Sequence, residues 1–94
     1  MAERKVVHVM ISGTVQGVWY RAWTEEQAAR RGLDGWVRNR RSGEVEAVFA
    51  GPAAKVDEMV AVCHEGPPAA RVVDVRATPG ADDPGRGFRK LPTA

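Results

Sequence analysis

Residues 5–32, KVVHVMISGTVQGVWYRAWTEEQAARRG, carry three different local patterns in one continuous stretch. Residues 5–11 are mostly apolar and β-branched, which predicts a buried strand that ends at Ser12-Gly13. Residues 20–31 are rich in Ala, Glu, Gln and Arg, which predicts a helix, and Gly32 stands where a helix end favours glycine. This part of the chain therefore predicts a strand, a glycine-containing loop and a helix.

Two further strands are predicted immediately after that helix. Residues 33–40 (LDGWVRNR) and 44–50 (EVEAVFA) have the composition and spacing of a hairpin, with turn chemistry in RSG at residues 41–43. Trp36 is expected to anchor the first of these strands in the core. Gly51-Pro52 then breaks the second strand.

The remaining sequence predicts a helix and two strands. Residues 56, 59, 60 and 63 are Val, Met, Val and Cys, with the i, i+3, i+4, i+7 spacing of an amphipathic helix. Residues 70–78 predict a fourth strand, and residues 88–91 a short edge strand. The order β-α-β-β-α-β predicts an α+β, ferredoxin-like split βαβ fold, with two helices on one face of an antiparallel sheet.

Length and composition indicate one small domain. The chain has 94 residues, 44% of them hydrophobic, which is enough for a single compact core. We therefore expect residues 1–94 to form one domain, and nothing in them demands more than a monomer. Cys63 is the only cysteine, so no internal disulfide can form, which suits a reducing compartment. The N-terminal residues lack the apolar run of a signal peptide or membrane span, so we expect a cytoplasmic protein without a membrane partner.

The charge of the chain does not point to nucleic acid. The net charge is only +2, although six arginines lie between residues 21 and 41 against three acidic residues. A solvated basic surface explains most of these arginines. The signature that RNA-recognition sheets use to stack bases is absent, so we expect no nucleic-acid partner, and an RNA-binding module remains the alternative from another class.

Arg21 stands at the start of the first predicted helix, where the peptide dipoles disfavour a cation. The loop before it, from Gly13 to Tyr20, contains no proline, so every residue keeps its N–H donor. Gly13 and Gly17 permit positive φ, which lets successive amides curl into an anion-binding nest beside the free amides of the helix start. Arg21 therefore makes sense if an anion, most simply a phosphate, binds there. The alternative is a plain strand-to-helix loop with an exposed arginine.

The loop does not match the common nucleotide-binding motifs. The sequence has no Gly-Lys-Ser or Gly-Lys-Thr, and the spacing from Gly13 to Gly17 differs from the dinucleotide fingerprint. A small phosphorylated molecule therefore fits this loop better than a nucleotide does.

The segments GTVQGVWYR (residues 13–21) and RGLDGWVRNRRSGEVEAVFAG (residues 31–51) resemble the acylphosphatase family. The signatures of that family are a G-x-V-Q-G-V-x-[FY]-R loop and a G-W-V-x-N strand followed by G-x-V-E. The resemblance extends in register from about Val7 to Gly51, and it implies a single acylphosphatase-like domain. The departures are small: Tyr20 stands where phenylalanine is common and needs a partner for its hydroxyl, and Ser42-Gly43 replaces an Asp-Gly turn.

The resemblance implies an enzyme that hydrolyses small-molecule acyl phosphates without a metal or cofactor. It assigns phosphate binding to Arg21 and positioning of the attacking water to Asn39. The implied phosphate cradle comprises Val15, Gln16, Gly17, Val18, Trp19, Tyr20 and Arg21. A domain that keeps this cradle without turnover, as a phosphate-binding module, is the alternative.

Four other side chains, those of His8, Trp19, Cys63 and His64, carry groups that could serve a function. His8, in the first strand, is expected to be a structural or surface residue. Cys63 is expected to be a small buried hydrophobe, and its neighbour His64 points elsewhere on a helix, so no zinc site is predicted. Trp19 lies within the cradle and is a candidate contact for the acyl end of a substrate.

Overall fold

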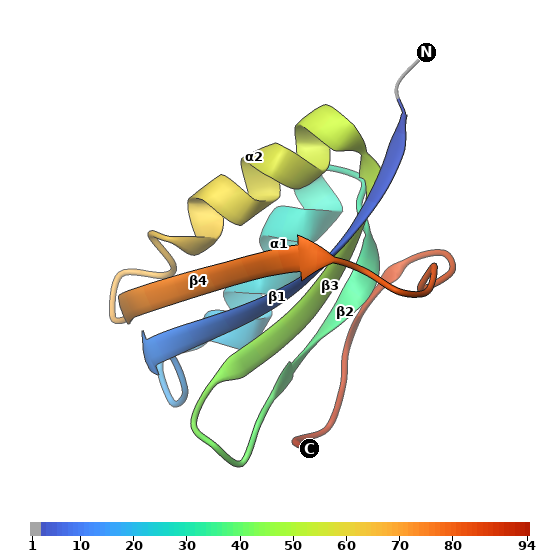
Figure 1. Ribbon diagram of the computed structural model, residues 1–94. Coiled ribbons are helices and arrows are strands. Elements are labelled where there is room, and N and C mark those ends of the chain that lie inside the picture. The colour runs from blue at the N-terminus through green and yellow to red at the C-terminus, as the bar shows by residue number, and fades with distance from the viewer. Residues whose placement is uncertain (1–2) are drawn as a thin grey trace.

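The structure, a computed structural model, describes residues 3–94 (Figure 1). Its elements follow the predicted order β-α-β-β-α-β, and the predicted short edge strand is present as the last of them. The elements are β1 (Arg4–Thr14), α1 (Tyr20–Arg30), β2 (Asp34–Asn39), β3 (Val45–Pro52), α2 (Ala53–Cys63), β4 (Arg71–Pro79) and β5 (Phe88–Lys90). The ferredoxin-like α+β fold is thus confirmed.

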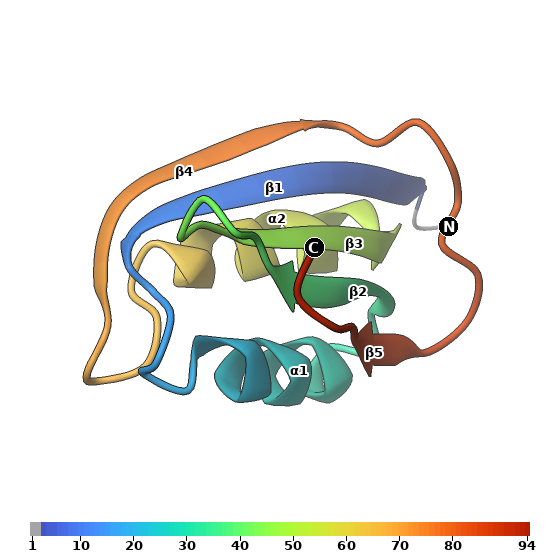
Figure 2. The ribbon, with the colours of Figure 1, turned by 90° about the horizontal axis from the view of Figure 1, so that it is seen from below.

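The five strands form one sheet in the order β4-β1-β3-β2-β5. The β1–β3, β1–β4 and β2–β3 pairs are antiparallel, whereas β5 pairs with β2 in parallel, a pairing that the prediction did not contain. The parallel edge follows from the path of residues 80–87, which cross from one sheet edge to the other at the end where β4 stops (Figure 2). Because β5 begins at the end where β4 stops, β5 runs in the direction opposite to β4. The antiparallel pairs give β2 that same direction, so β5 and β2 are parallel.

Both helices cover the same face of the sheet, and the core lies between the two layers (Figure 2). The central strand β3 is buried from Val45 to Gly51. On α2 the buried residues are Val56, Met59 and Cys63, which confirms the predicted apolar stripe. On α1 they are Tyr20, Thr24 and Ala28, spaced four apart.

Trp36 lies on the other face of the sheet, so the prediction that it anchors the core is wrong. Its neighbours Gly35 and Val37 are buried, and the period-two alternation of a strand turns Trp36 away from the helices. The indole is half-buried instead beneath the guanidinium of Arg38, whose Cζ lies 4.8 Å from the ring centroid. The apolar content of β2 is therefore divided between both faces.

The first strand does not end at Ser12-Gly13 but continues to Thr14. A register shift against β4 occurs between Ser12 and Gly13, which is a β-bulge. Gly13 has φ +122°, and a Cβ there would lie 2.1 Å from the carbonyl oxygen of Arg71. Glycine is required at this position by the close approach of β4, because any side chain would collide with its backbone.

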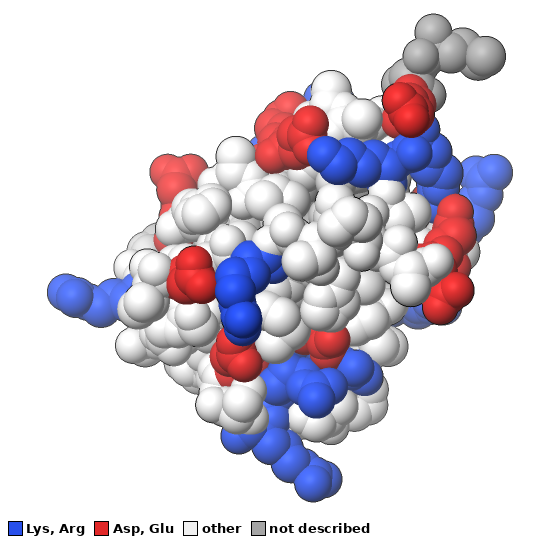
Figure 3. Space-filling model, viewed as in Figure 1, with Lys and Arg blue, Asp and Glu red and all other residues white. Residues whose placement is uncertain are grey.

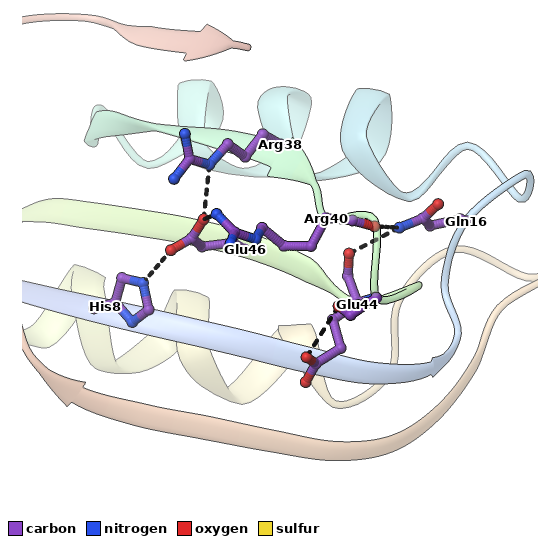
Figure 4. A network of polar contacts seen from close by, with 7 residues as sticks. His8, Gln16, Arg38, Arg40, Glu44 and Glu46 are labelled. Carbon is purple, nitrogen blue, oxygen red and sulfur yellow. Dashed lines mark hydrogen bonds and ion pairs between the residues drawn. The ribbon is translucent and has the colours of Figure 1, made fainter. Parts of the chain in front are cut away.

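The open face of the sheet carries basic and acidic side chains side by side rather than one basic patch (Figure 3). Glu46 lies on this face near the start of the central strand β3, and it is only 9% exposed. Its carboxylate contacts His8 Nε2 at 2.6 Å and accepts hydrogen bonds from Arg38 Nε at 2.7 Å and Arg40 at 3.3 Å (Figure 4). Burial alone would raise the pKa of Glu46, but the hydrogen bonds from His8 and Arg38 outweigh it and hold the pKa below its usual value.

We expect Glu46→Gln to lower the free energy of unfolding at pH 7 by about 1–3 kcal/mol, because charged hydrogen bonds to two arginines are lost. A carboxyl whose folded pKa is depressed contributes stability above its unfolded pKa and loses it as pH falls through the folded pKa. Urea unfolding from pH 7 down to pH 3 should therefore show a shallower acid decline in Glu46→Gln than in wild type. The exposed Glu65 provides the matched control, Glu65→Gln. An unchanged acid decline in Glu46→Gln would contradict the role of this carboxylate.

Candidate active site

A pocket of about 300 Å³ opens where the loop after β1 meets the start of α1. Four parts of the chain form it: the loop of residues 15–19, the first turn of α1, the last residue of β2 and the last residue of β5. Its lining residues are Val15, Gln16, Gly17, Trp19, Tyr20, Arg21, Ala22, Asn39 and Lys90. None of these nine is acidic, and two carry a positive charge. The pocket therefore favours an anion.

The loop of residues 15–19 supplies free backbone donors to this pocket. None of the N–H groups of residues 16–19 donates a hydrogen bond to an acceptor within residues 3–94. Gly17 has φ +74° and Trp19 has φ +68°, so the predicted left-handed conformation occurs at Gly17 and again two residues later. The first amides of α1 add further donors, since a helix start leaves them without intrahelical partners.

Arg21 lies in the first turn of α1 and lines the same pocket. That first turn contains no acidic residue, and no carboxylate within residues 3–94 pairs with Arg21. Most arginines near it in the sequence have partners: Arg30, Arg31, Arg38 and Arg40 each form an ion pair. Arg21 is left with its five donors free and its charge unbalanced.

Asn39 faces the pocket from the end of β2. In the register of the sheet it lies opposite Val45, on the face that the helices cover. Its Oδ1 atom is buried and accepts no hydrogen bond from the described residues. A buried acceptor without a donor costs about 1–3 kcal/mol, so the structure favours a donor from outside the protein, such as a water molecule. The backbone carbonyl of Asn39 accepts from the N–H of Ala94 at 3.0 Å, which fixes the strand end.

Tyr20 joins the loop to the core. Its side chain is 1% exposed, and its hydroxyl donates to the carbonyl oxygen of Cys63 at 2.7 Å, which supplies the partner that the sequence required. Burial, with Cys63 nearby, raises the pKa of this hydroxyl well above its usual value, so it remains a donor. The start of α1 is thereby held against the end of α2, and Arg21, the next residue, is held with it.

The side chain of Gln16 ties the loop to the β2–β3 hairpin. Its Nε2 donates to the carbonyl oxygen of Arg40 at 2.7 Å and to that of Glu44 at 2.9 Å (Figure 4). Arg40 follows Asn39 directly in the chain, so these bonds connect the free amides to the strand end that carries Asn39. Both amide hydrogens of Gln16 are used in this way, so its side chain acts as a brace, and the donor that Gln16 has left for a ligand is its backbone N–H.

The structure thus brings together all but one of the residues proposed from the sequence. Arg21 and Asn39, which are 18 residues apart, line one pocket with Val15, Gln16, Gly17, Trp19 and Tyr20. Val18 does not line it, because its side chain packs against the core. Sequence reasoning missed Ala22 and Lys90. The signal for Lys90 was its position two residues after Phe88 in a strand, which places both on the helix-covered face.

The other candidates have structural surroundings. Cys63 is fully buried, and burial raises the pKa of its thiol to about 12, as expected for a packed residue. His8 belongs to the Glu46 network on the open face. Within residues 3–94 there is no group of three or more His, Cys, Asp or Glu able to hold a metal ion. Nor does the described chain include a helix with the length and apolar character to cross a membrane.

Fold and pocket together define a class: a ferredoxin-like α+β domain with an amide-lined cationic pocket at its first helix. Residues 7–90 match the family model described as acylphosphatase. An acylphosphatase of Rhizorhabdus wittichii is 56% identical over 93 residues, covering 97% of this chain and 92% of the relative. One of Rhodospirillum rubrum is 55% identical, covering 95% of this chain and 98% of the relative.

The solved structure of an acylphosphatase from Coxiella burnetii superimposes on this chain with a TM-score of 0.89. It is 33% identical, and the match covers 94% of this chain and 93% of that structure. The chain belongs to the acylphosphatase family. It is therefore a hydrolase that acts on acid anhydrides.

Proposed function

We propose that this chain hydrolyses the carboxyl–phosphate bond of acyl phosphates, giving a carboxylate and inorganic phosphate. The loop amides and Arg21 hold the phosphate, and Asn39 positions the attacking water. The observation that carries this assignment is the pairing, in one pocket, of a guanidinium without a counter-ion and a buried amide oxygen without a donor. The first calls for an anion and the second for a hydrogen-bond donor such as water.

At the phosphate end, the substrate oxygens accept from the N–H groups around residues 15–20 and from the guanidinium of Arg21. These donors are fixed before the substrate arrives, because the brace from Gln16 and the buried hydroxyl of Tyr20 hold the loop. Phosphoryl transfer depends mainly on such positioning and on stabilising charge on the phosphoryl oxygens. Arg21 provides both, since its planar fork can make two parallel charged hydrogen bonds.

In the reaction step, the water oxygen bonds to phosphorus while the bond between phosphorus and the acyl oxygen breaks. The electron pair of that bond leaves with the carboxylate, which is a weak base and needs little help from a general acid. Asn39 orients the water in line but cannot serve as a strong base, so the water proton passes to an oxygen of the substrate phosphate. The atoms and charges balance with no further reactant.

Metal independence is part of the proposal. The charge that a metal would supply in phosphoryl transfer is supplied by Arg21, with Lys90 as the second cation of the pocket. The nine lining residues include no carboxylate, thiol or imidazole, the groups that hold catalytic metals in most hydrolases. We further propose that the protein acts as a monomer in the cytoplasm and binds no nucleic acid.

Turnover of benzoyl phosphate by the wild-type protein, with and without EDTA, tests this function. We expect hydrolysis far above the rate in buffer, the same rate in EDTA, and competitive inhibition by inorganic phosphate. Rates restored only by added Mg²⁺ would overturn metal independence. A folded protein that binds phosphate in calorimetry without turnover would instead be a phosphate-binding module. A salt-sensitive shift of RNA, with no turnover, would favour the RNA-binding alternative.

A further inference from the structure

Trp19 is an exposed aromatic residue in a backbone conformation that suits it poorly. Its relative exposure is 81%, a value that Val73 alone matches among the large hydrophobic residues described as exposed. Its φ of +68° and ψ of +21° lie in the left-handed region, where a bulky non-glycine residue is a rare outlier. It also occupies the N-cap of α1 without a side-chain hydrogen bond, at a position that favours Ser, Thr, Asp or Asn. Three local preferences are broken at one residue.

Packing does not explain Trp19. The two neighbours of Trp19 in the chain both face the core. Val18 packs against the core, and Tyr20 is buried and contacts the ring of Trp23. Within the described residues, the indole of Trp19 forms neither a ring–ring pair with another aromatic residue nor a cation–π pair with an arginine or lysine. Strained residues that the surrounding fold does not need occur preferentially at functional sites. The strain at Trp19 accordingly points to the pocket that it lines.

An acyl phosphate has two chemically different ends, and the pocket residues differ in the same way. The free amides and Arg21 suit the phosphate, as proposed above. For the acyl end, Val15 and Tyr20 offer almost no accessible surface, since each is 1% exposed. Trp19 is the lining residue with a large accessible apolar surface. It is the N-cap of α1, and Arg21 lies two residues further on, in the first turn of that helix. The volume of about 300 Å³ matches the lower end of small-molecule sites, about 300–1,000 Å³.

We propose that the indole of Trp19 packs against the acyl group of the substrate and makes the enzyme selective for aromatic and extended apolar acyl phosphates over acetyl phosphate. The proposal rests on the hydrolytic function proposed above and names the substrate class that this pocket takes. An aryl group can stack on the indole face, whereas a methyl group covers little of it. Stacking of this kind corresponds to a preference of about 3- to 10-fold.

The test compares kcat/KM for benzoyl phosphate and acetyl phosphate in wild type, Trp19→Ala and Trp19→Phe. We expect the benzoyl-to-acetyl ratio to fall about 3- to 10-fold in Trp19→Ala and to be largely kept in Trp19→Phe, which retains a ring. Binding should follow the same pattern: calorimetry with phenacylphosphonate and acetonylphosphonate, in which a CH₂ replaces the bridging oxygen, should show a loss of affinity in Trp19→Ala mainly for the phenyl compound.

The matched control is Val73→Ala, which shortens an equally exposed apolar side chain on β4 that does not line the pocket, and it should leave the ratio unchanged. Equal loss on both substrates in Trp19→Ala, or an unchanged ratio, would overturn the proposal and make Trp19 a support of the loop. If wild type hydrolyses neither substrate, the proposed function fails, and the acyl contact fails with it. Circular dichroism of each variant separates these results from loss of folding.

Discussion

Arg21→Ala is expected to lower kcat/KM for benzoyl phosphate at least a hundredfold, equivalent to about 3 kcal/mol of transition-state stabilisation. The guanidinium provides positive charge where the phosphoryl oxygens become more negative. Because Arg21 pairs with no carboxylate of the described residues, the substrate does not have to displace one when it binds. The free energy of unfolding should rise by about 0.3–1 kcal/mol in the same variant, because a cation is removed from the positive end of α1. A more stable but inactive protein would mark Arg21 as a residue kept for function.

Steady-state kinetics, inhibition by inorganic phosphate and urea unfolding provide the measurements. Arg71→Ala is the control: it removes the same charge from an exposed position on β4 where no ion pair forms within the described residues, and it should leave kcat/KM unchanged. Arg21→Lys keeps the charge but not the planar fork, so its loss should be smaller than that of alanine. A normal rate in Arg21→Ala would refute the assignment.

Asn39→Ala is expected to lower kcat about a hundredfold while affecting phosphate binding much less than Arg21→Ala does. The reason is that Asn39 orients water and does not neutralise the anion. Removing it also removes a buried acceptor that has no protein donor, so the free energy of unfolding should not fall by more than about 0.5 kcal/mol. The inhibition constant for inorganic phosphate, measured beside kcat and unfolding, separates these contributions.

Asn39→Asp sharpens this test, because it keeps the shape of the side chain and adds a negative charge. That charge would repel the substrate phosphate, so both kcat and phosphate affinity should fall. Gln27→Ala, an amide deletion on α1 outside the pocket, is the control. If Asn39→Ala instead raised KM and the phosphate inhibition constant with kcat unchanged, Asn39 would be a binding residue and the water would be positioned elsewhere.

Much of the fold could be predicted because its signals are local. Three local signals each specify an element from a few neighbouring residues: the apolar, β-branched composition of residues 5–11, the spacing of Val56, Met59 and Cys63, and the turn at residues 41–43. Trp36 shows the limit of such reasoning. A strand of apolar and polar residues can turn either face inward, and here the burial of Gly35 and Val37 sends the indole to the open face. Side-chain volume in the sequence does not reveal which face packs.

The candidate site likewise has a part that a short segment of sequence predicts and a part that depends on distant segments. The amides, the glycine at position 17 and the cation at a helix start are properties of one short segment, so the sequence alone predicts an anion-binding loop ending in Arg21. Only the tertiary structure decided that Gln16 braces the hairpin, that Asn39 presents an unpaired oxygen and that Lys90 reaches the pocket from β5. Those contacts join segments that lie 18 or more residues apart along the chain. Their partners are selected by the register and handedness of the sheet, which no local pattern encodes.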